Sequence, residues 1–266
     1  MKVSLTIPAW NEEQYIRACL ESVFAQTEQP DEVIVVDNNC TDRTVEIVKE
    51  FPSVRVVKEK TPGASFSRNA GFNAATGDLI CRTDADTRLR PNWIAHIKRY
   101  MTAHPDVIGL SGPAQFYDIP KILRLREWPA NVVLLSVKSM LGHDVMFGPN
   151  IAMRKEAWQK IKNEVCTNDR LVHEDIDLSI HLAKYGKIKF DTKLIVDSSP
   201  RRWKKLMPYI EYPYRYITTV QQHMNLPAHL KLKPMNLKPI KIKPRVKSVK
   251  SKLHSGLLAF KQLNPF

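Results

Sequence analysis

Short apolar runs alternate with helix-like segments over the first hundred residues, and this alternation constrains the fold more than any other feature of the chain. The runs are typical of strands that are buried on both faces. The segments between them place apolar residues at helical spacing. Strands that alternate with helices predict an α/β protein with a doubly wound, mostly parallel sheet. The expected strands span 3–7, 32–37, 54–58 and 79–84, and helices are expected at about 11–24, 41–48, 65–76 and 91–100.

Polar and special residues are expected to set the ends of these helices. Asn11 should cap the first helix, with Gln14 as its capping-box partner. Gly77 should form the C-terminal cap of the helix at 65–76, and Pro91 should open the fourth helix.

The pattern becomes less regular after residue 110. Two further strands are predicted by the stretches VIGLSG (107–112) and FGPNIAMR (147–154), and a helix is predicted from near Glu174 to Gly186. Residues 119–142 mix Leu, Trp and Val with Lys and Arg, so we expect an irregular, partly amphipathic segment there.

The positive charge of the chain is confined to its last quarter. The net charge is +14, and residues 201–266 hold 15 Lys and Arg against the single acid Glu211. We therefore expect a catalytic domain over 1–200 and a basic extension over 201–266 that reaches an acidic partner. Lysine-proline pairs recur around residues 234, 239 and 244, which predicts partial disorder from about residue 227. Residues 255–263 could form a short terminal helix.

The sequence shows no sign of export or of a membrane span. The N-terminus runs directly into a strand pattern, and the apolar cluster at 131–141 is too short to cross a bilayer. Four scattered cysteines suit a reducing compartment. We expect a cytoplasmic protein, peripheral on the inner face of the membrane if the basic extension binds anionic lipid.

Two carboxylates, Asp84 and Asp86, follow the fourth apolar run directly. If the strand continued through them, both would lie on one face, where like charges about 4 Å apart repel by ~1 kcal/mol in water and ~4 kcal/mol at an effective dielectric of 20. A solvated turn is one interpretation. A divalent cation held by hard oxygen ligands is the other. Asp37 ends an earlier strand, and ligands of doubly wound sheets bind beyond such ends, which favours the cation.

Several motifs together resemble the family 2 glycosyltransferases, which have the GT-A fold. They are IPAWNEE (7–13), VVDNNCTD (35–42), GASFSRNAGFNAATGD (63–78), TDADT (83–87), FGPNIAMRKEAW (147–158) and HEDIDLS (173–179). Their order and spacing are more specific than any one motif, and the resemblance covers roughly residues 1–200. It implies an inverting transfer of a sugar from a nucleoside-diphosphate sugar, with a UDP-sugar favoured, to a glycan or lipid-linked acceptor in cell-envelope polysaccharide synthesis.

The resemblance also implies roles for individual residues. Asp86 and Asp84 would bind Mn²⁺ or Mg²⁺, with Asp84 shared between the metal and the ribose. The metal would stabilise the charge that develops on the departing nucleoside diphosphate. The implied nucleotide-binding residues are Pro8, Ala9, Glu12, Asp37, Arg68 and Asp84. Glu12 could equally favour a helix N-terminus, and Arg68 could be an ordinary surface residue.

The acceptor side of the implied site lies later in the chain. Asp175 is expected to be the base that takes the acceptor proton, although acids at a helix start also suit the helix dipole. Glu174, Asp177 and Asn150 would contact the acceptor or donor sugar. In the stretch SPRRW (199–203), Arg202 or its neighbour Arg201 could contact the diphosphate. The histidines show no spacing typical of a zinc site.

Other functions remain open on the sequence alone. A polyprenyl phosphate acceptor is already ionised and would not need Asp175 as a base, and the basic extension would then lie on anionic lipid. A nucleic-acid-associated protein is disfavoured, because the basic extension has few aromatic residues for stacking on bases. A transferase fold without catalysis is disfavoured because Asp84, Asp86 and Asp175 are all present.

Overall fold

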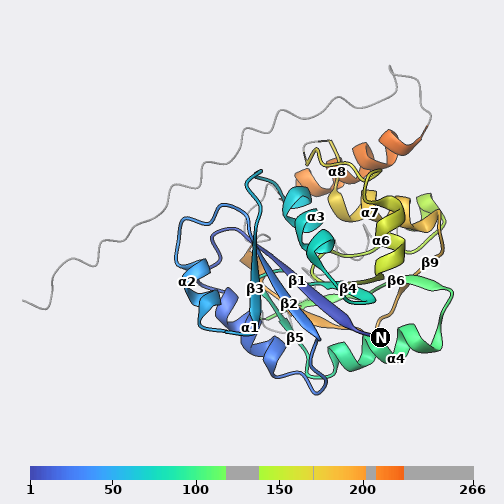
Figure 1. Cartoon of the computed structure of the whole chain (residues 1–266). Helices are drawn as coiled ribbons and strands as arrows, with labels where there is room; N and C mark the ends of the chain where they lie inside the picture. Colours follow the sequence, from blue (N-terminus) through green and yellow to red (C-terminus); the bar gives the residue numbers. More distant parts are fainter. Residues whose placement is uncertain (118–137, 170, 202–207, 225–266) are drawn as a thin grey trace, which may run out of the picture. The chain divides into compact units, whose positions relative to one another are not determined.

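The computed structural model describes residues 1–117, 138–169, 171–201 and 208–224 (Figure 1). The chain divides into the units Met1–Pro234 and Met235–Phe266. The second unit lies wholly outside the described residues, as do Arg202 and most of the segment 119–142. The expected disorder from residue 227 and the helix at 255–263 therefore stay predictions.

A seven-stranded sheet forms the centre of the first unit, in the order β3-β2-β1-β4-β8-β6-β9. All neighbouring pairs are parallel except those of β8, which runs antiparallel to β4 and to β6. This confirms the mixed, mostly parallel α/β sheet expected from the sequence. The strands are β1 (Val3–Ala9), β2 (Glu32–Asp37), β3 (Val54–Lys58), β4 (Leu79–Arg82), β6 (Val107–Ser111), β8 (Ile151–Arg154) and β9 (Lys187–Phe190).

A smaller sheet joins segments that are far apart in the sequence. Its order is β5-β10-β7, with bounds Thr87–Leu89 for β5, Ala114–Phe116 for β7 and Val196–Ser198 for β10. The central strand β10 is antiparallel to β5 and parallel to β7. These short strands were not predicted from the sequence.

Helices cover both faces of the large sheet, as the alternating pattern requires (Figure 1). One face packs against α1 (Ile16–Phe24), α2 (Thr44–Lys49) and α4 (Trp93–Ala103). The other packs against α3 (Ala64–Ala74), α6 (Lys155–Ile161) and α7 (Glu174–Ala183). Helix α8 (Pro208–His223) lies in the segment that the sequence assigns to the basic extension, and it contacts α7 through a hydrogen bond from the His173 amide to Thr219 (2.6 Å). Among the described residues, no helix is long and apolar enough to cross a lipid bilayer.

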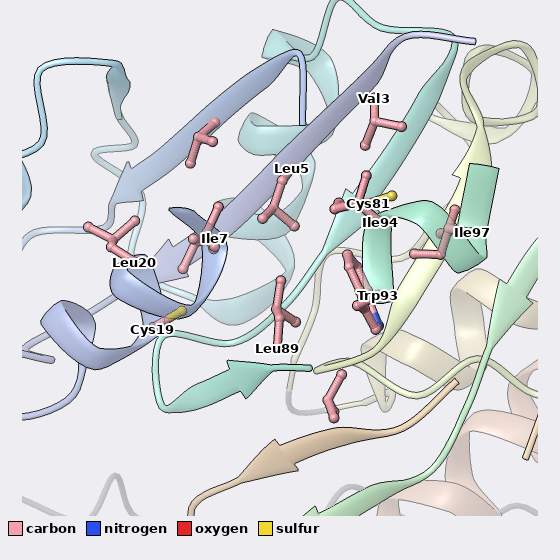
Figure 2. Close-up of a cluster of buried hydrophobic side chains, with 14 of the residues drawn as sticks. Val3, Leu5, Ile7, Cys19, Leu20, Cys81, Leu89, Trp93, Ile94 and Ile97 are labelled. Atoms are coloured by element: carbon pink, nitrogen blue, oxygen red, sulfur yellow. The ribbon is translucent and has the colours of Figure 1, made fainter. Parts of the chain in front are cut away.

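Alternate residues of β1 supply one core. Val3, Leu5 and Ile7 are fully buried and point toward α1 and α4, as Figure 2 shows. This period of two is that of an extended strand. Leu20 on α1 and Trp93 on α4 close the same cluster from the helices.

Three local expectations are wrong. Asn11 does not cap α1: it adopts a left-handed backbone (φ 56°), its side chain accepts a hydrogen bond from the Thr41 amide (2.8 Å), and the helix begins only at Ile16. Gly77 does not cap α3, which ends at Ala74. A Cβ atom on Gly77 would lie 2.8 Å from the Lys2 carbonyl oxygen, so the glycine allows close approach to the chain entering β1. Strand β4 ends at Arg82, and the chain turns through Asp84–Asp86 instead of continuing as a strand.

Candidate active site

The carboxyl ends of β1, β2 and β4 meet at one edge of the sheet. Ala9 and Asp37 are paired in register as the last residues of their strands, and Arg82 ends β4 on the other side of β1. Parallel strands place the residues that follow them together, so Asp84 and Asp86 emerge at this same edge. Pro8, Ala9 and Asp37 are therefore brought to the edge that the sequence predicted. Asp37 accepts a hydrogen bond from the Cys40 amide (2.8 Å), which shapes the turn after β2.

Arg82 is the centre of a buried ionic cluster. Its Nη2 lies 3.0 Å from Asp84 Oδ1 and 3.5 Å from Glu174 Oε1, and its Nη1 lies 3.0 Å from Asp175 Oδ1. The guanidinium thus joins the turn after β4 to the first turn of α7, about ninety residues later in the chain. Arg82 therefore connects Asp84, a predicted metal ligand, with Asp175, the predicted base. The sequence analysis did not single out Arg82 itself.

Asp175 is held from a second direction by Gly148. The Gly148 amide donates to Asp175 Oδ2 (2.9 Å), and a Cβ atom on Gly148 would lie only 2.6 Å from that oxygen. A side chain at position 148 would therefore displace the carboxylate. This contact gives a physical reason for a glycine in the stretch FGPN.

Burial and charge act against each other in this cluster. Burial raises the pKa of the Asp175 carboxyl, Arg82 lowers it in part, and Glu174 raises it. Burial would lower the pKa of Arg82, but the surrounding carboxylates hold it above its usual value, so Arg82 stays charged. A carboxylate with a raised pKa is a stronger base, which suits a group that must accept a proton.

Asp86 pairs with Arg201 instead of with Arg82. Arg201 Nε lies 2.6 Å from Asp86 Oδ2, and its Nη2 donates to Glu12 Oε1 (2.5 Å). The same guanidinium lies over the Tyr15 ring, 4.6 Å from its centroid. Arg201 thus brings Glu12 and Asp86 together. The sequence analysis gave Arg201 as the alternative to Arg202 for a diphosphate contact.

The small sheet places Arg201 in this position. Ser198 of β10 pairs with Thr87 of β5, directly after Asp86. The Asp86 carbonyl accepts hydrogen bonds from the Ser199 amide and from the Tyr117 hydroxyl (both 3.1 Å). Residues 199–201 are therefore fixed beside the turn that carries Asp84 and Asp86.

The turn offers the donor set that a hard divalent cation prefers. Asp84 and Asp86 are carboxylates two positions apart at the edge of the sheet, and both are already in contact with cationic guanidinium groups. A side-chain cation beside Asp86 indicates a place where positive charge is stabilised. The residues fit Mn²⁺ or Mg²⁺, provided that Arg201 moves or shares Asp86 with the ion.

Three predicted site residues lie away from this edge or are engaged inside the protein. Arg68 is buried rather than on the surface, and its Nη1 donates to the Glu174 carbonyl oxygen (2.7 Å).

Asn150 is fully buried. Its side chain accepts a hydrogen bond from Trp93 Nε1 (2.9 Å) and donates to the carbonyl oxygens of Leu194 (2.6 Å) and Pro113 (3.3 Å). Asp177 is fully buried and turns toward α8. Asn150 and Asp177 therefore have structural partners at the atoms that a sugar would contact.

Comparison with known proteins identifies the family of this chain. The family model described as Glycosyl transferase family 2 matches residues 4–162. The probable glycosyltransferase YdaM of Bacillus subtilis (strain 168) is 28% identical over 221 residues, which are 76% of this chain and 52% of that protein. The undecaprenyl-phosphate 4-deoxy-4-formamido-L-arabinose transferase of Pectobacterium carotovorum subsp. carotovorum (strain PC1) is 32% identical over 116 residues, which are 40% of this chain and 36% of that protein. The chain thus spans about half or less of the length of these curated relatives.

Solved structures share the arrangement of strands and helices at low identity. The mannosyltransferase PcManGT from Pyrobaculum calidifontis, in complex with GDP-Man and Mn²⁺, has a TM-score of 0.65 and 19% identity, covering 84% of this chain and 64% of that one. TarS 1–349 from S. aureus, in complex with UDP-GlcNAc, has a TM-score of 0.58 and 18% identity, covering 75% of this chain and 58% of that one. At this identity the likeness concerns the fold.

Proposed function

Because the chain belongs to glycosyl transferase family 2 and has the GT-A fold, we propose that it moves a sugar, with inversion, from a nucleoside-diphosphate sugar to an acceptor hydroxyl in the synthesis of a glycan or cell-envelope polysaccharide. The observation that carries this proposal is the Arg82 cluster. One guanidinium contacts both Asp84, the proposed metal ligand and ribose contact, and Asp175, the proposed base. The two halves of a transfer site are thereby tied to each other.

The donor half uses the edge formed by β1, β2 and β4. Asp86 and Asp84 would hold Mn²⁺ or Mg²⁺, which supplies charge stabilisation to the leaving nucleoside diphosphate when it is bound. Arg201 lies beside Asp86 and could pair with a phosphate oxygen, because a guanidinium binds phosphate in a fork. Pro8, Ala9, Glu12 and Asp37 would line the nucleoside. The neighbours solved with UDP-GlcNAc, and with GDP-Man and Mn²⁺, support this class of donor without selecting the base.

The acceptor half is built around Asp175. In a single displacement the acceptor oxygen forms the new bond to the anomeric carbon as the bond to the diphosphate breaks, and the hydroxyl proton passes to an Asp175 oxygen. The hydrogen bonds from Arg82 and Gly148 hold that carboxylate in place. Glu174 borders the same guanidinium and would contact the acceptor.

Thermal unfolding with a nucleotide panel tests the donor site. We expect UDP, or one of GDP, dTDP and CMP, to raise the unfolding midpoint in the presence of Mn²⁺. At a concentration one hundred times its dissociation constant, the nucleotide should add about 2.7 kcal/mol to the free energy of unfolding. The shift should vanish with EDTA and in Asp86→Ala. It should persist in the control Asp106→Asn, which changes an exposed aspartate that pairs with Lys187. No shift for any nucleotide in a folded, metal-loaded protein would refute the donor site.

A polyprenyl phosphate acceptor is the second candidate. The 32% identical segment of an undecaprenyl-phosphate sugar transferase and the 15 basic residues after residue 200 favour it. The basic extension would then bind anionic lipid at the cytoplasmic face, at about 1 kcal/mol per basic residue near the surface. Asp175→Asn separates the two: we expect a loss of about 10²–10⁴-fold in turnover for a hydroxyl acceptor, and turnover within about tenfold of the original for a phosphate acceptor.

A further inference from the structure

A cluster of three metal-binding side chains lies apart from the proposed active site, between α7 and α8. Asp177 and His181 are four residues apart and therefore share one face of α7, and His223 ends α8. One ligand atom from each of these residues lies within 4.8 Å of the other two. The histidine spacing in the sequence gave no sign of such a site, because the third member is forty-two residues away.

The distances from Asp177 to the two histidines lie on either side of the separation that a metal ion needs. Asp177 Oδ1 lies 2.8 Å from His223 Nε2 and 3.7 Å from His181 Nε2. In a tetrahedral zinc site with bonds of about 2.0–2.1 Å, ligand atoms are ~3.3 Å apart. The two imidazole rings meet edge to face, with centroids 4.9 Å apart.

Neighbouring groups orient two of the three side chains. The Cys166 amide donates to Asp177 Oδ2 (2.8 Å), which leaves Oδ1 facing both histidines. His181 Nδ1 lies 3.2 Å from Glu164 Oε2. A metal-binding histidine commonly donates its other ring nitrogen to a carboxylate, which fixes the tautomer with the lone pair on Nε2.

The Nε2 atom of His181 makes no hydrogen bond within the part of the chain that the structure describes. Its distance of 3.7 Å from Asp177 is too long for one. In the other tautomer Nδ1 would accept from Lys184 (3.2 Å), and Nε2–H would point at an oxygen that it cannot reach.

We propose that Asp177, His181 and His223 bind one divalent transition metal ion of the zinc class, which ties α8 to α7. Two imidazoles and one carboxylate are ligands that suit Zn²⁺, and they are distinct from the hard oxygen pair at Asp84 and Asp86. The ion fixes the end of α8 against the helix whose first turn carries Glu174 and Asp175. The site does not depend on which sugar or acceptor the protein uses.

Zinc titration of the untagged full chain tests this site. After removal of metal, we expect calorimetry with Zn²⁺ to show a tight site that persists in Asp86→Ala, and we expect the unfolding midpoint to rise as this site fills. Co²⁺ should give the visible absorption of a site with nitrogen ligands. His223→Gln should weaken Zn²⁺ binding at least tenfold, and because this side chain is partly exposed the variant should still fold.

Two controls separate this site from others. His96→Gln removes a histidine that is also paired with a carboxylate, Asp191 (2.7 Å), and should leave Zn²⁺ affinity unchanged. Asp86→Ala should also leave it unchanged, which distinguishes the site from the proposed donor site. The proposal is overturned if Zn²⁺ does not bind to the original protein. It is also overturned if His223→Gln and His181→Gln bind Zn²⁺ as tightly as the original protein does.

Discussion

Replacing Arg82 by methionine tests how the buried ionic cluster is held together. Methionine fills a similar volume without the charge. The change leaves three carboxylates, Asp84, Glu174 and Asp175, without their shared cation, and the Asp175 side chain is only 8% exposed. We expect Arg82→Met to destabilise the fold strongly at alkaline pH and less at acidic pH.

The magnitude follows from burial. Removing one partner of a buried ion pair costs about 3–5 kcal/mol, because the remaining charge is not compensated. For a domain of this size the unfolding midpoint should fall by roughly 6–20 °C, at about 2–4 °C per kcal/mol. Arg17→Met is the matched control: Arg17 pairs with Glu50 at 2.7 Å, but both side chains are about half exposed, at 46% and 51%. Such a surface pair contributes about 0–1 kcal/mol.

The pH dependence has a definite sign. Burial raises the pKa of Asp175 in the folded protein, and Arg82 partly offsets this. Without Arg82 the folded pKa rises further above the unfolded value of about 3.9. A carboxyl group with a raised folded pKa favours folding at low pH and loses that contribution as the pH rises through the folded value. The deficit of Arg82→Met relative to the original protein should therefore grow between about pH 4 and pH 8.

The assay is thermal or urea unfolding of both variants across this pH range. A deficit for Arg82→Met no larger than that of Arg17→Met at pH 8, or one that does not change with pH, would refute the account of the cluster.

Two further predictions concern positions that support the site. Asn150→Ala should cost about 2–5 kcal/mol in urea unfolding, because it leaves Trp93 Nε1 and two carbonyl groups without their buried partner; an unchanged midpoint would mean that its hydrogen bonds are not structural. Gly112→Ala should cost about 1–3 kcal/mol, since the new Cβ atom would lie 2.0 Å from the Leu194 carbonyl oxygen. In Gly109→Ala, three residues earlier in β6, the new Cβ atom would meet the flexible Met146 and Ile188 side chains, so equal losses for the two variants would contradict this reasoning.

The central sheet was predictable because the apolar residues of its buried strands stand out in the sequence. The runs at 3–7 and 32–37 are mostly apolar, as parallel strands between two helical layers are expected to be, and they match the buried strands β1 and β2 closely. The run at 54–58 matches β3, an edge strand whose Arg55 and Lys58 are exposed. The short strands β5, β7 and β10 were missed, because three residues are too few for a period of two to stand out against a loop.

The candidate site was predictable only in part. Asp84, Asp86 and Asp175 stood out as acids at the ends of predicted elements, and the structure brings Asp84 and Asp175 to one guanidinium. Arg82 falls within the predicted strand 79–84, and nothing in the sequence near it indicates which distant acids it will meet. Arg68 belongs to the stretch GASFSRNAGFNAATGD and was expected to bind nucleotide or to lie on the surface, but it is buried. Burial of an arginine depends on tertiary partners that the local sequence does not reveal.

The central position of β10 in the small sheet determines when the proposed donor site can form during synthesis. Strands β5 and β7 have no hydrogen-bonded contact with each other in this sheet, and each must wait for residues 196–198. A ribosome adding about 5–20 residues per second needs several seconds to pass from residue 117 to residue 201. Over that interval Asp86 lacks its partner Arg201, so the proposed donor site is incomplete in the nascent chain. We therefore expect this site to form only after residues 196–201 have been made.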